Sequence, residues 1–134
     1  MNRMQADIQS IIEKKELFER LKDSTVLITG ATGFIGSMLM KTLYAASNKY
    51  GLDIKIIGQV RNIKKTKEIF RQMIDDVKFV VDADISCDYI IHTVSPTTSK
   101  FFIEHPVETI RISVESLMEI LEVTKKNNAV LVYI

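Results

Sequence analysis

The chain contains a single cysteine, Cys87, and only two histidines among its 134 residues. One thiol cannot build an internal disulfide framework, which excludes the class of small secreted proteins held together by disulfides and makes a reducing cytoplasm the expected compartment. The histidines and the cysteine lie at unrelated spacings, so no metal site is recognisable. Cys87 is expected to be a small buried side chain without a redox role.

Excess charge and long apolar runs are also lacking. The 18 basic and 17 acidic residues leave a net charge of +1, which gives no electrostatic basis for binding nucleic acid or an anionic membrane surface. No apolar run approaches the roughly 20 residues that span a bilayer, and the first residues lack the apolar core of a signal peptide. With 46% hydrophobic residues, the chain fits one globular domain with its own core.

Short apolar segments alternate with helical patterns along the chain. The strands are expected at residues 25–29, 54–58, 77–81, 88–93 and 129–134. The helices are expected at residues 3–21, 35–47, 64–74 and 107–126, with a loop at 94–104. One stripe of the last helix carries the apolar residues Val107, Ile110, Val114, Leu117, Met118 and Leu121.

Parallel strands joined by helices need right-handed crossovers, which predicts an α/β fold. We expect a Rossmann-like doubly wound parallel sheet of strand order 3-2-1-4-5, truncated after the fifth strand. Residues 1–22 form an amphipathic leader helix, and residues 23–134 an incomplete dinucleotide-binding domain. The leader is expected to pack on its own domain, with an oligomer contact as the alternative. A ligand would lie across the carboxyl ends of the first and fourth strands, where residues 30–36 meet residues 93–95.

The most informative segment is residues 29–36, TGATGFIG, between the first strand and its helix. Gly30 allows a tight turn, Gly33 lets the backbone approach a phosphate, and Gly36 lets the helix pack close to the strand. Free amide N–H groups and the positive end of the helix dipole would then face the anion. The segment therefore predicts a site for the diphosphate of a dinucleotide, with a plain turn as the alternative.

Taken together, these residues resemble the extended short-chain dehydrogenase/reductase family, specifically its NAD-dependent nucleotide-sugar epimerases, dehydratases and decarboxylases. The likeness runs from about Thr25 to the last residue. Beside the glycine segment it rests on residues 90–96, IIHTVSP, followed by residues 105–109, HPVET, and a long helix. This second stretch is similar to the UDP-glucuronate decarboxylase branch.

The resemblance implies where parts of the cofactor, NAD, would lie. The backbone at Thr32, Phe34 and Ile35 would contact the pyrophosphate, and Asp84 and Ile85 occupy the place that holds the adenine. An aspartate after a strand can accept a hydrogen bond from an exocyclic amine while an apolar neighbour covers the ring. A solvated loop carboxylate is the alternative for Asp84.

Thr93, Val94 and Ser95 occupy the place beside the nicotinamide ribose, again by resemblance. At the end of the second strand, many NAD-using relatives carry an acidic residue, whereas this chain has Arg61 and Asn62. Arg61 could pair with the 2′-phosphate of NADP, stack on adenine or point to water. NAD is therefore the expected cofactor, with NADP left open.

Other departures concern polar residues near the expected site. His92 stands at the ligand edge, but its place in an apolar strand favours a hydrogen-bonded core histidine over a general base. Ser113 replaces the asparagine usual in the family, and Ser116 with Leu117 replaces a Gly-Thr pair. Loss of the amide removes a side chain that both donates and accepts hydrogen bonds near the ribose.

No catalytic residue is expected in this segment. The family delivers a Ser or Thr after the fifth strand and then a Tyr-x-x-x-Lys helix, but none of the four tyrosines here precedes a lysine at that spacing. We expect the NAD(P)-binding portion of an enzyme that transfers hydride to and from the carbon of a nucleotide sugar, inactive alone. The alternative is a non-catalytic nucleotide-binding or oligomerising module. The open fifth strand predicts a homodimer or larger oligomer.

Overall fold

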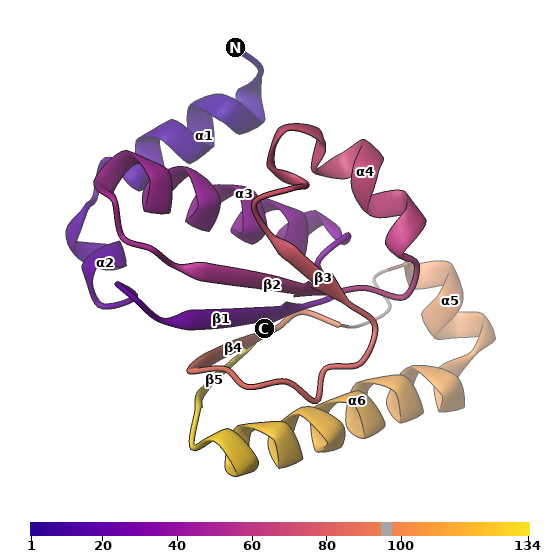
Figure 1. Ribbon diagram of the computed structural model, residues 1–134. Helices are drawn as coiled ribbons and strands as arrows, with labels where there is room; N and C mark the ends of the chain where they lie inside the picture. Colours follow the sequence, from indigo (N-terminus) through magenta and orange to yellow (C-terminus); the bar gives the residue numbers. More distant parts are fainter. Residues whose placement is uncertain (95–97) are drawn as a thin grey trace.

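The computed structural model describes residues 1–94 and 98–134. Five strands form one parallel sheet in the order β3-β2-β1-β4-β5 (Figure 1), which confirms the predicted α/β fold and strand order. The register pairs Thr29 at the end of β1 with Gln59 of β2 and His92 of β4, so these strands end at one edge. The strands are β1 (Thr25–Thr29), β2 (Lys55–Gln59), β3 (Lys78–Val80), β4 (Tyr89–His92) and β5 (Val130–Tyr133).

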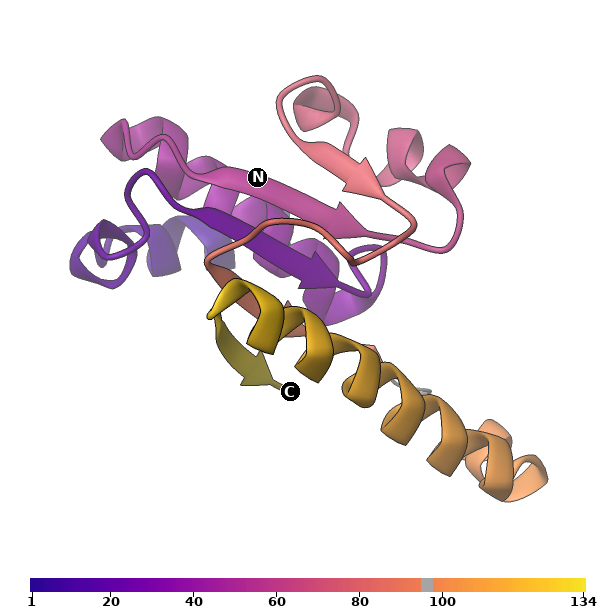
Figure 2. The same cartoon turned by 60° about the horizontal axis from the view of Figure 1, so that its bottom comes forward.

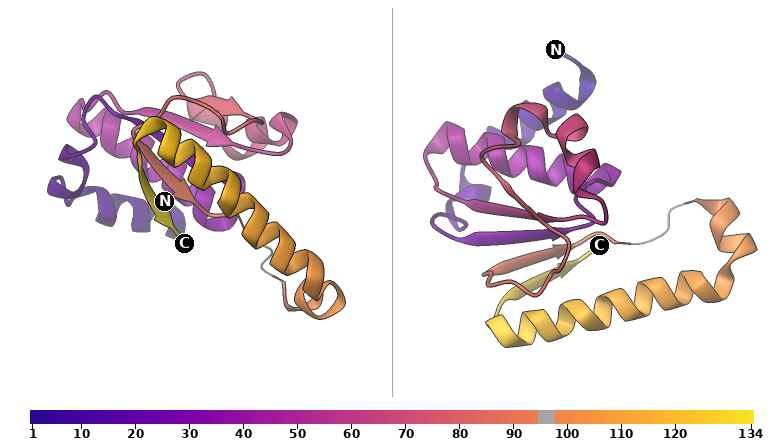
Figure 3. Two further views of the ribbon diagram at one scale, coloured as in Figure 1. Left: turned by 90° about the horizontal axis from the view of Figure 1, so that it is seen from below. Right: turned by 45° about the vertical axis from the view of Figure 1, so that its right-hand side comes forward.

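Helices lie on both sides of this sheet, as the right-hand view of Figure 3 shows. One side carries α1 (Arg3–Ile12), α2 (Glu16–Glu19), α3 (Phe34–Tyr50) and α4 (Thr66–Ile69), the last flanked by the short 3-10 turns η1 (Ile63–Lys65) and η2 (Arg71–Met73). The chain then forms α5 (Ser99–Glu104), and α6 (Pro106–Asn127) covers the other side. Within the described ranges, no helix combines the length and the apolar character needed to cross a bilayer.

The predicted leader helix is in fact two helices, α1 and α2, because the chain turns at residues 13–15. In one straight helix, Ile12 and Phe18 would point about 120° apart. The turn brings both side chains into the cluster against α3, together with Ile8. The leader therefore packs on its own domain through α3.

Two further boundaries differ from the sequence prediction. The helix expected at residues 64–74 is broken at Phe70, whose backbone leaves the helical region so that its ring is buried against Phe79, with 4.9 Å between ring centres. The loop expected at 94–104 contains α5, whose first turn is capped by the Thr98 hydroxyl. Between these two segments the chain forms β3 and β4, the two strands predicted there.

Helix α6 is longer than the sheet that it covers. Its 22 residues extend about 33 Å, whereas the four residues of β4 extend about 13 Å. Its N-terminal half therefore projects past the sheet (Figure 2), and only Ile120 and Val123 are fully buried. The predicted apolar stripe does not face the sheet: its exposed members are Val107, Ile110, Val114, Met118 and Leu121.

Gly58 in β2 sets how closely α3 approaches the sheet. A Cβ atom at this residue would lie 2.8 Å from Ala31 Cβ, 3.0 Å from Met40 Cε and 3.0 Å from Phe79 Cδ1. Real Cβ atoms do not tolerate such distances, so a side chain here would push the turn and α3 away from the strand.

We expect Gly58→Ala to lower the free energy of unfolding by about 1–3 kcal/mol, the usual cost of overpacking a core. Urea denaturation of both proteins measures the difference. Gly51→Asn is the matched control, because Gly51 ends α3 at φ 59°, where asparagine is tolerated, and no atom lies within 4 Å of its Cβ position. A Gly58→Ala protein as stable as the control would contradict this packing account.

Candidate functional site

The glycine segment forms a tight turn between β1 and α3. Gly30 adopts the left-handed region at φ 65°, and a Cβ atom there would lie 2.9 Å from Thr93 Oγ1. The Ala31 N–H donates to the Gln59 carbonyl at 3.2 Å, and the Gly33 N–H donates to the Gly30 carbonyl at 3.0 Å. Both the backbone angle and the lack of space therefore require glycine at residue 30.

The same turn presents the start of α3 without a side-chain cap. Gly33 is the N-cap residue, makes no side-chain hydrogen bond, and no acidic residue follows in the first turn. A Cβ atom on Gly36 would overlap the Gly30 carbonyl oxygen, so the helix begins directly against the turn. The first N–H groups of α3 and the positive end of its dipole are thus available to an anion.

The residues around these N–H groups are accessible. Phe34 and Ile35 are 76% and 46% exposed, and Thr32 is half-buried. Helical spacing places Ile35 on the same stripe as Leu43 and Ala46, but the structure buries only the latter two. Ile35 belongs to the first turn, which lies beyond the end of β1, and so its side chain has no strand to pack on.

Thr93 follows β4 directly and contacts the glycine turn from the side of that strand. Its hydroxyl donates to the Thr29 carbonyl at 2.7 Å, and its N–H donates to Thr29 Oγ1 at 3.2 Å. The structure therefore brings Thr93 against the glycine turn, where the sequence placed it. Val94 is half-buried, and Ser95 lies outside the described residues.

His92, the residue before Thr93, is a buried core histidine, as predicted. Its Nδ1 lies 2.6 Å from Thr29 Oγ1, its Nε2 lies 3.4 Å from Ser116 Oγ, and its ring stacks on Tyr133. Since Thr29 Oγ1 already accepts from Thr93, the arrangement favours a Thr29 hydroxyl that donates to Nδ1 and a proton on Nε2. Burial lowers the pKa of His92 from its ordinary value of 6.5, so the ring is neutral at pH 7.

Asp84 and Ile85 are held at the C-terminal end of α6. The Asp84 carboxylate pairs with Lys126 at 2.9 Å, and the Ile85 carbonyl accepts from Asn127 Nδ2 at 2.9 Å. Both charged side chains are mostly exposed, so this ion pair contributes little to stability. The structure thus ties the predicted adenine residues to α6, and none of their hydrogen bonds within the described ranges reaches the glycine turn.

Arg61 and Asn62 lie just past the end of β2, on the same edge of the sheet as the turn. Arg61 is exposed, and Asn62 Oδ1 accepts from the Lys64 N–H at 3.0 Å as the cap of η1. Asn62 therefore has a structural hydrogen bond of its own. No carboxylate follows β2 until Glu68, and the charged residues before it are all basic: Arg61, Lys64, Lys65 and Lys67.

Sequence reasoning missed the side-chain partners in this region. The sequence places Thr29 and Ser116 near the site but does not pair them with His92, and the spacing of Lys126 gives no sign of Asp84 as its partner. Among the described residues, no group of three or more His, Cys, Asp or Glu side chains could hold a metal ion. The region can bind an anion through backbone amides, and its described residues form no assembled acid–base pair.

Comparison with known proteins agrees with this geometry. Residues 26–134 match the model of the NAD dependent epimerase/dehydratase family. The X-ray structure of Pen from Bacillus thuringiensis is similar over 84% of this chain at a TM-score of 0.70 and 16% identity. The chain spans 37% of that protein's length.

Two further solved structures are similar in fold. UDP-glucose 4-epimerase from Bifidobacterium longum, in complex with NAD+ and UDP, matches 82% of this chain and 36% of its own at a TM-score of 0.61 and 19% identity. Epimerase Mth375 from Methanothermobacter thermautotrophicus matches 92% of this chain and 38% of its own, at a TM-score of 0.64 and 19% identity. The chain therefore spans little more than a third of each of these structures.

We expect the neutral state of His92 to make folding sensitive to acid. The folded pKa is below 6.5, so the unfolded chain binds a proton first as the pH falls, and stability is lost from about 6.5 down to the folded pKa. The unfolding free energy in urea, measured on either side of pH 6.5, should fall with decreasing pH. His92→Gln, which cannot titrate, should show a smaller fall.

His105→Gln is the matched control, because His105 is exposed and lies outside the network. It should keep the slope of the original protein. Equal slopes for the original protein and His92→Gln would show that His92 is not held neutral by burial.

Proposed function

This chain belongs to the NAD dependent epimerase/dehydratase family, and we propose that its residues 23–134 bind NAD, with the diphosphate on the amides of residues 30–36. The observation that carries this proposal is the uncapped N-terminus of α3, held against a turn that only glycine can form at residue 30. Backbone N–H groups and a helix dipole directed at one point suit a diphosphate better than any neutral group.

The remaining contacts of the proposal follow the sequence motifs. The backbone at Thr32, Phe34 and Ile35 binds the pyrophosphate, and Thr93, Val94 and Ser95 lie beside the nicotinamide ribose. The nearness of Thr93 to Gly30 supports this part.

The adenine end of the proposal involves Asp84, Ile85, Arg61 and Asn62. Adenine at Asp84 and Ile85 requires the Asp84 carboxylate to share or release Lys126, which the exposure of this ion pair allows. NAD is the proposed cofactor. Arg61 could hold the additional phosphate of NADP, so both nucleotides belong in the binding experiment.

For the whole protein we propose an enzyme that removes a hydride from a carbon of a nucleotide sugar and returns it within the same cycle. The bound NAD would supply the hydride chemistry, while this segment positions its two halves. The sequence of residues 90–96 and 105–109 supports the UDP-glucuronate decarboxylase branch, and the single buried cysteine supports a cytoplasmic setting. Because no tyrosine precedes a lysine at the required spacing, these 134 residues alone should show no turnover.

Gly33→Asp tests the diphosphate site and should change binding far more than folding. The backbone at residue 33 is extended, with φ −70° and ψ 173°, so aspartate can cap α3, but its Cβ would lie 3.3 Å from the Gly30 carbonyl oxygen. The two effects oppose each other, so stability should change by no more than about a few tenths of a kcal/mol. Its carboxylate would then occupy the anion position, and NAD affinity should fall by about a hundredfold or more. Calorimetric titration with NAD and with NADP measures the affinity.

Gly33→Asn is the matched control, because it offers nearly the same shape and the same capping bond without the charge. It should weaken NAD much less than Gly33→Asp does. Equal NAD affinity for the original protein and Gly33→Asp would refute the diphosphate site, as would heats no larger than dilution for the original protein with both nucleotides.

We also propose that the chain forms a homodimer through the exposed stripe of α6 and the open edge of β5. Val107, Ile110 and Val114 are each at least half exposed, and Val130 at the start of β5 is 56% exposed. Exposed apolar stripes such as that of Val107, Ile110 and Val114 usually mark a contact with another protein. This proposal selects a second copy of the chain because the free edge of β5 can pair with its own copy.

Sedimentation velocity should show a dimer, and the double variant Ile110→Glu/Val114→Glu should be monomeric because two carboxylates cannot be buried without partners. Val81→Glu is the control, since Val81 is 55% exposed just after β3 at the opposite edge of the sheet. A concentrated original protein that sediments as a monomer would overturn the dimer.

A further inference from the structure

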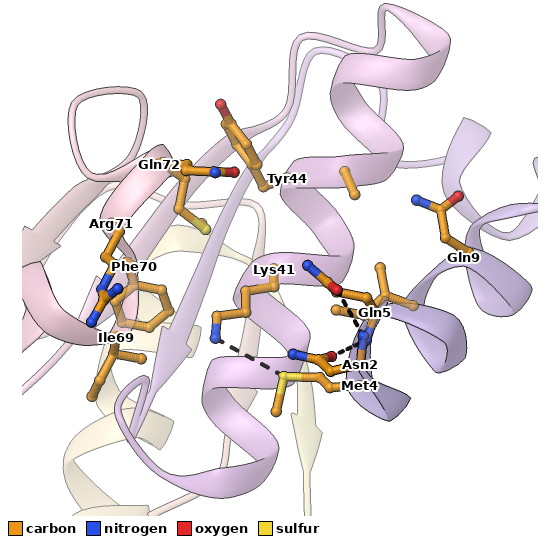
Figure 4. Close-up of a pocket in the computed structure, with 13 residues that line it drawn as sticks. Asn2, Met4, Gln5, Gln9, Lys41, Tyr44, Ile69, Phe70, Arg71 and Gln72 are labelled. Atoms are coloured by element: carbon orange, nitrogen blue, oxygen red, sulfur yellow. Dashed lines mark hydrogen bonds between the residues drawn. The ribbon is translucent and has the colours of Figure 1, made fainter.

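A pocket that none of residues 29–36 lines lies between α1, the middle of α3 and the 3-10 turn η2 (Figure 4). Its volume is about 660 Å³, within the range of small-molecule sites. One of its walls, α1, precedes the residues that match the family model. The proposed NAD site and the α6 surface do not account for this pocket.

The charged side chains that line the pocket are both cationic. They are Lys41 from α3 and Arg71 from η2, and no aspartate or glutamate lines it. The rest of the lining combines apolar side chains such as Met4 and Phe70 with uncharged polar groups. A pocket with two cations and no carboxylate attracts an anion.

Lys41 has only weak partners for its ammonium group. Nζ lies 4.0 Å from Met4 Sδ and 6.0 Å from the centre of the Phe70 ring, and the side chain is half-buried. Among residues 1–94 and 98–134, neither Lys41 nor Arg71 forms an ion pair with a carboxylate. A sulfur atom and a ring face compensate a partly desolvated ammonium poorly, so an anionic oxygen would bind it more strongly.

Three other polar side chains of the pocket already have partners. Asn2 and Gln5 bond each other's backbone as the capping box of α1, and the Tyr44 hydroxyl donates to Asp76 at 2.5 Å. These groups hold the walls in place without using the two cations. Among the described residues, the two cations are the charged groups of the lining, and neither has a strong acceptor.

The apolar part of the lining indicates the body of the ligand. Phe70 and Met73 are buried, and the Phe70 ring packs on Phe79 with Lys41 Nζ 6.0 Å from its centre, so these two side chains form the floor of the pocket. The accessible apolar lining is half-buried and consists of Met4, Ala45 and Ile69. An apolar group can pack against these side chains while its acid group reaches a cation.

We infer that this pocket binds a small carboxylate with an apolar body, with the acid group at Lys41 or Arg71 and the apolar body against Met4 and Ile69. The site is separate from the proposed NAD site, so the two ligands bind without competition. The inference does not depend on the proposed function.

Calorimetric titration of the 134-residue protein with 2-naphthoate tests the inference. Binding is expected with 2-naphthoate and about tenfold weaker with the neutral 2-naphthalenemethanol, which keeps the rings and lacks the charge. At least one of Lys41→Met and Arg71→Gln should weaken 2-naphthoate by about tenfold, the loss of one charge-assisted bond. Saturation with NAD should leave the affinity unchanged.

Lys49→Met is the matched control, because Lys49 belongs to the same helix and does not line the pocket. It should bind 2-naphthoate as the original protein does, and circular dichroism checks that all variants fold. Equal binding of the acid and the alcohol, or unchanged affinity in both pocket variants, would overturn the inference and indicate adhesion to the exposed stripe of α6. Absence of heat with the original protein would overturn it as well.

Discussion

The close contact between Gly36 and the Gly30 carbonyl is the constraint on which the rest of the structure depends. It fixes α3 directly at the end of β1, and hydrogen bonds from Ala31 to β2 and from Thr93 to β1 hold the turn from both sides. Because the turn is held by backbone atoms and small side chains, the first N–H groups of α3 remain accessible. The contact between Gly36 and the Gly30 carbonyl therefore determines both the close packing of α3 on the turn and the anion site.

The far side of the sheet depends on a different interaction, a buried chain of hydrogen bonds. His92 links Thr29 of β1 to Ser116 of α6, and the apolar contacts of Ile120 and Val123 complete the attachment. Only the C-terminal half of α6 is fixed in this way, since β4 is too short to cover the helix. The remaining apolar surface of α6 is available for other contacts. The pocket between α1, α3 and η2, on the opposite face of the sheet, is available as well.

The strand order and the position of the glycine turn followed from the sequence because both depend on local patterns: apolar runs, helical spacing and glycines where the backbone needs them. Sequence also identified His92 as a core residue. It could not predict the break between α1 and α2, the exposure of the stripe around Val114, or the pairing of Asp84 with Lys126. These features depend on lengths and distances between elements that are far apart along the chain.

The most direct test of the central claim is a titration of the nitrogen-15-labelled protein with NAD, followed by amide NMR shifts. Diphosphate bound at the turn should shift the backbone amides of Thr32, Phe34, Ile35 and Gly36 more than those of β5. These four signals should also be far less affected by NAD in Gly33→Asp. If the amide signals of residues 32–36 did not shift while NAD saturated the protein, the account would be contradicted.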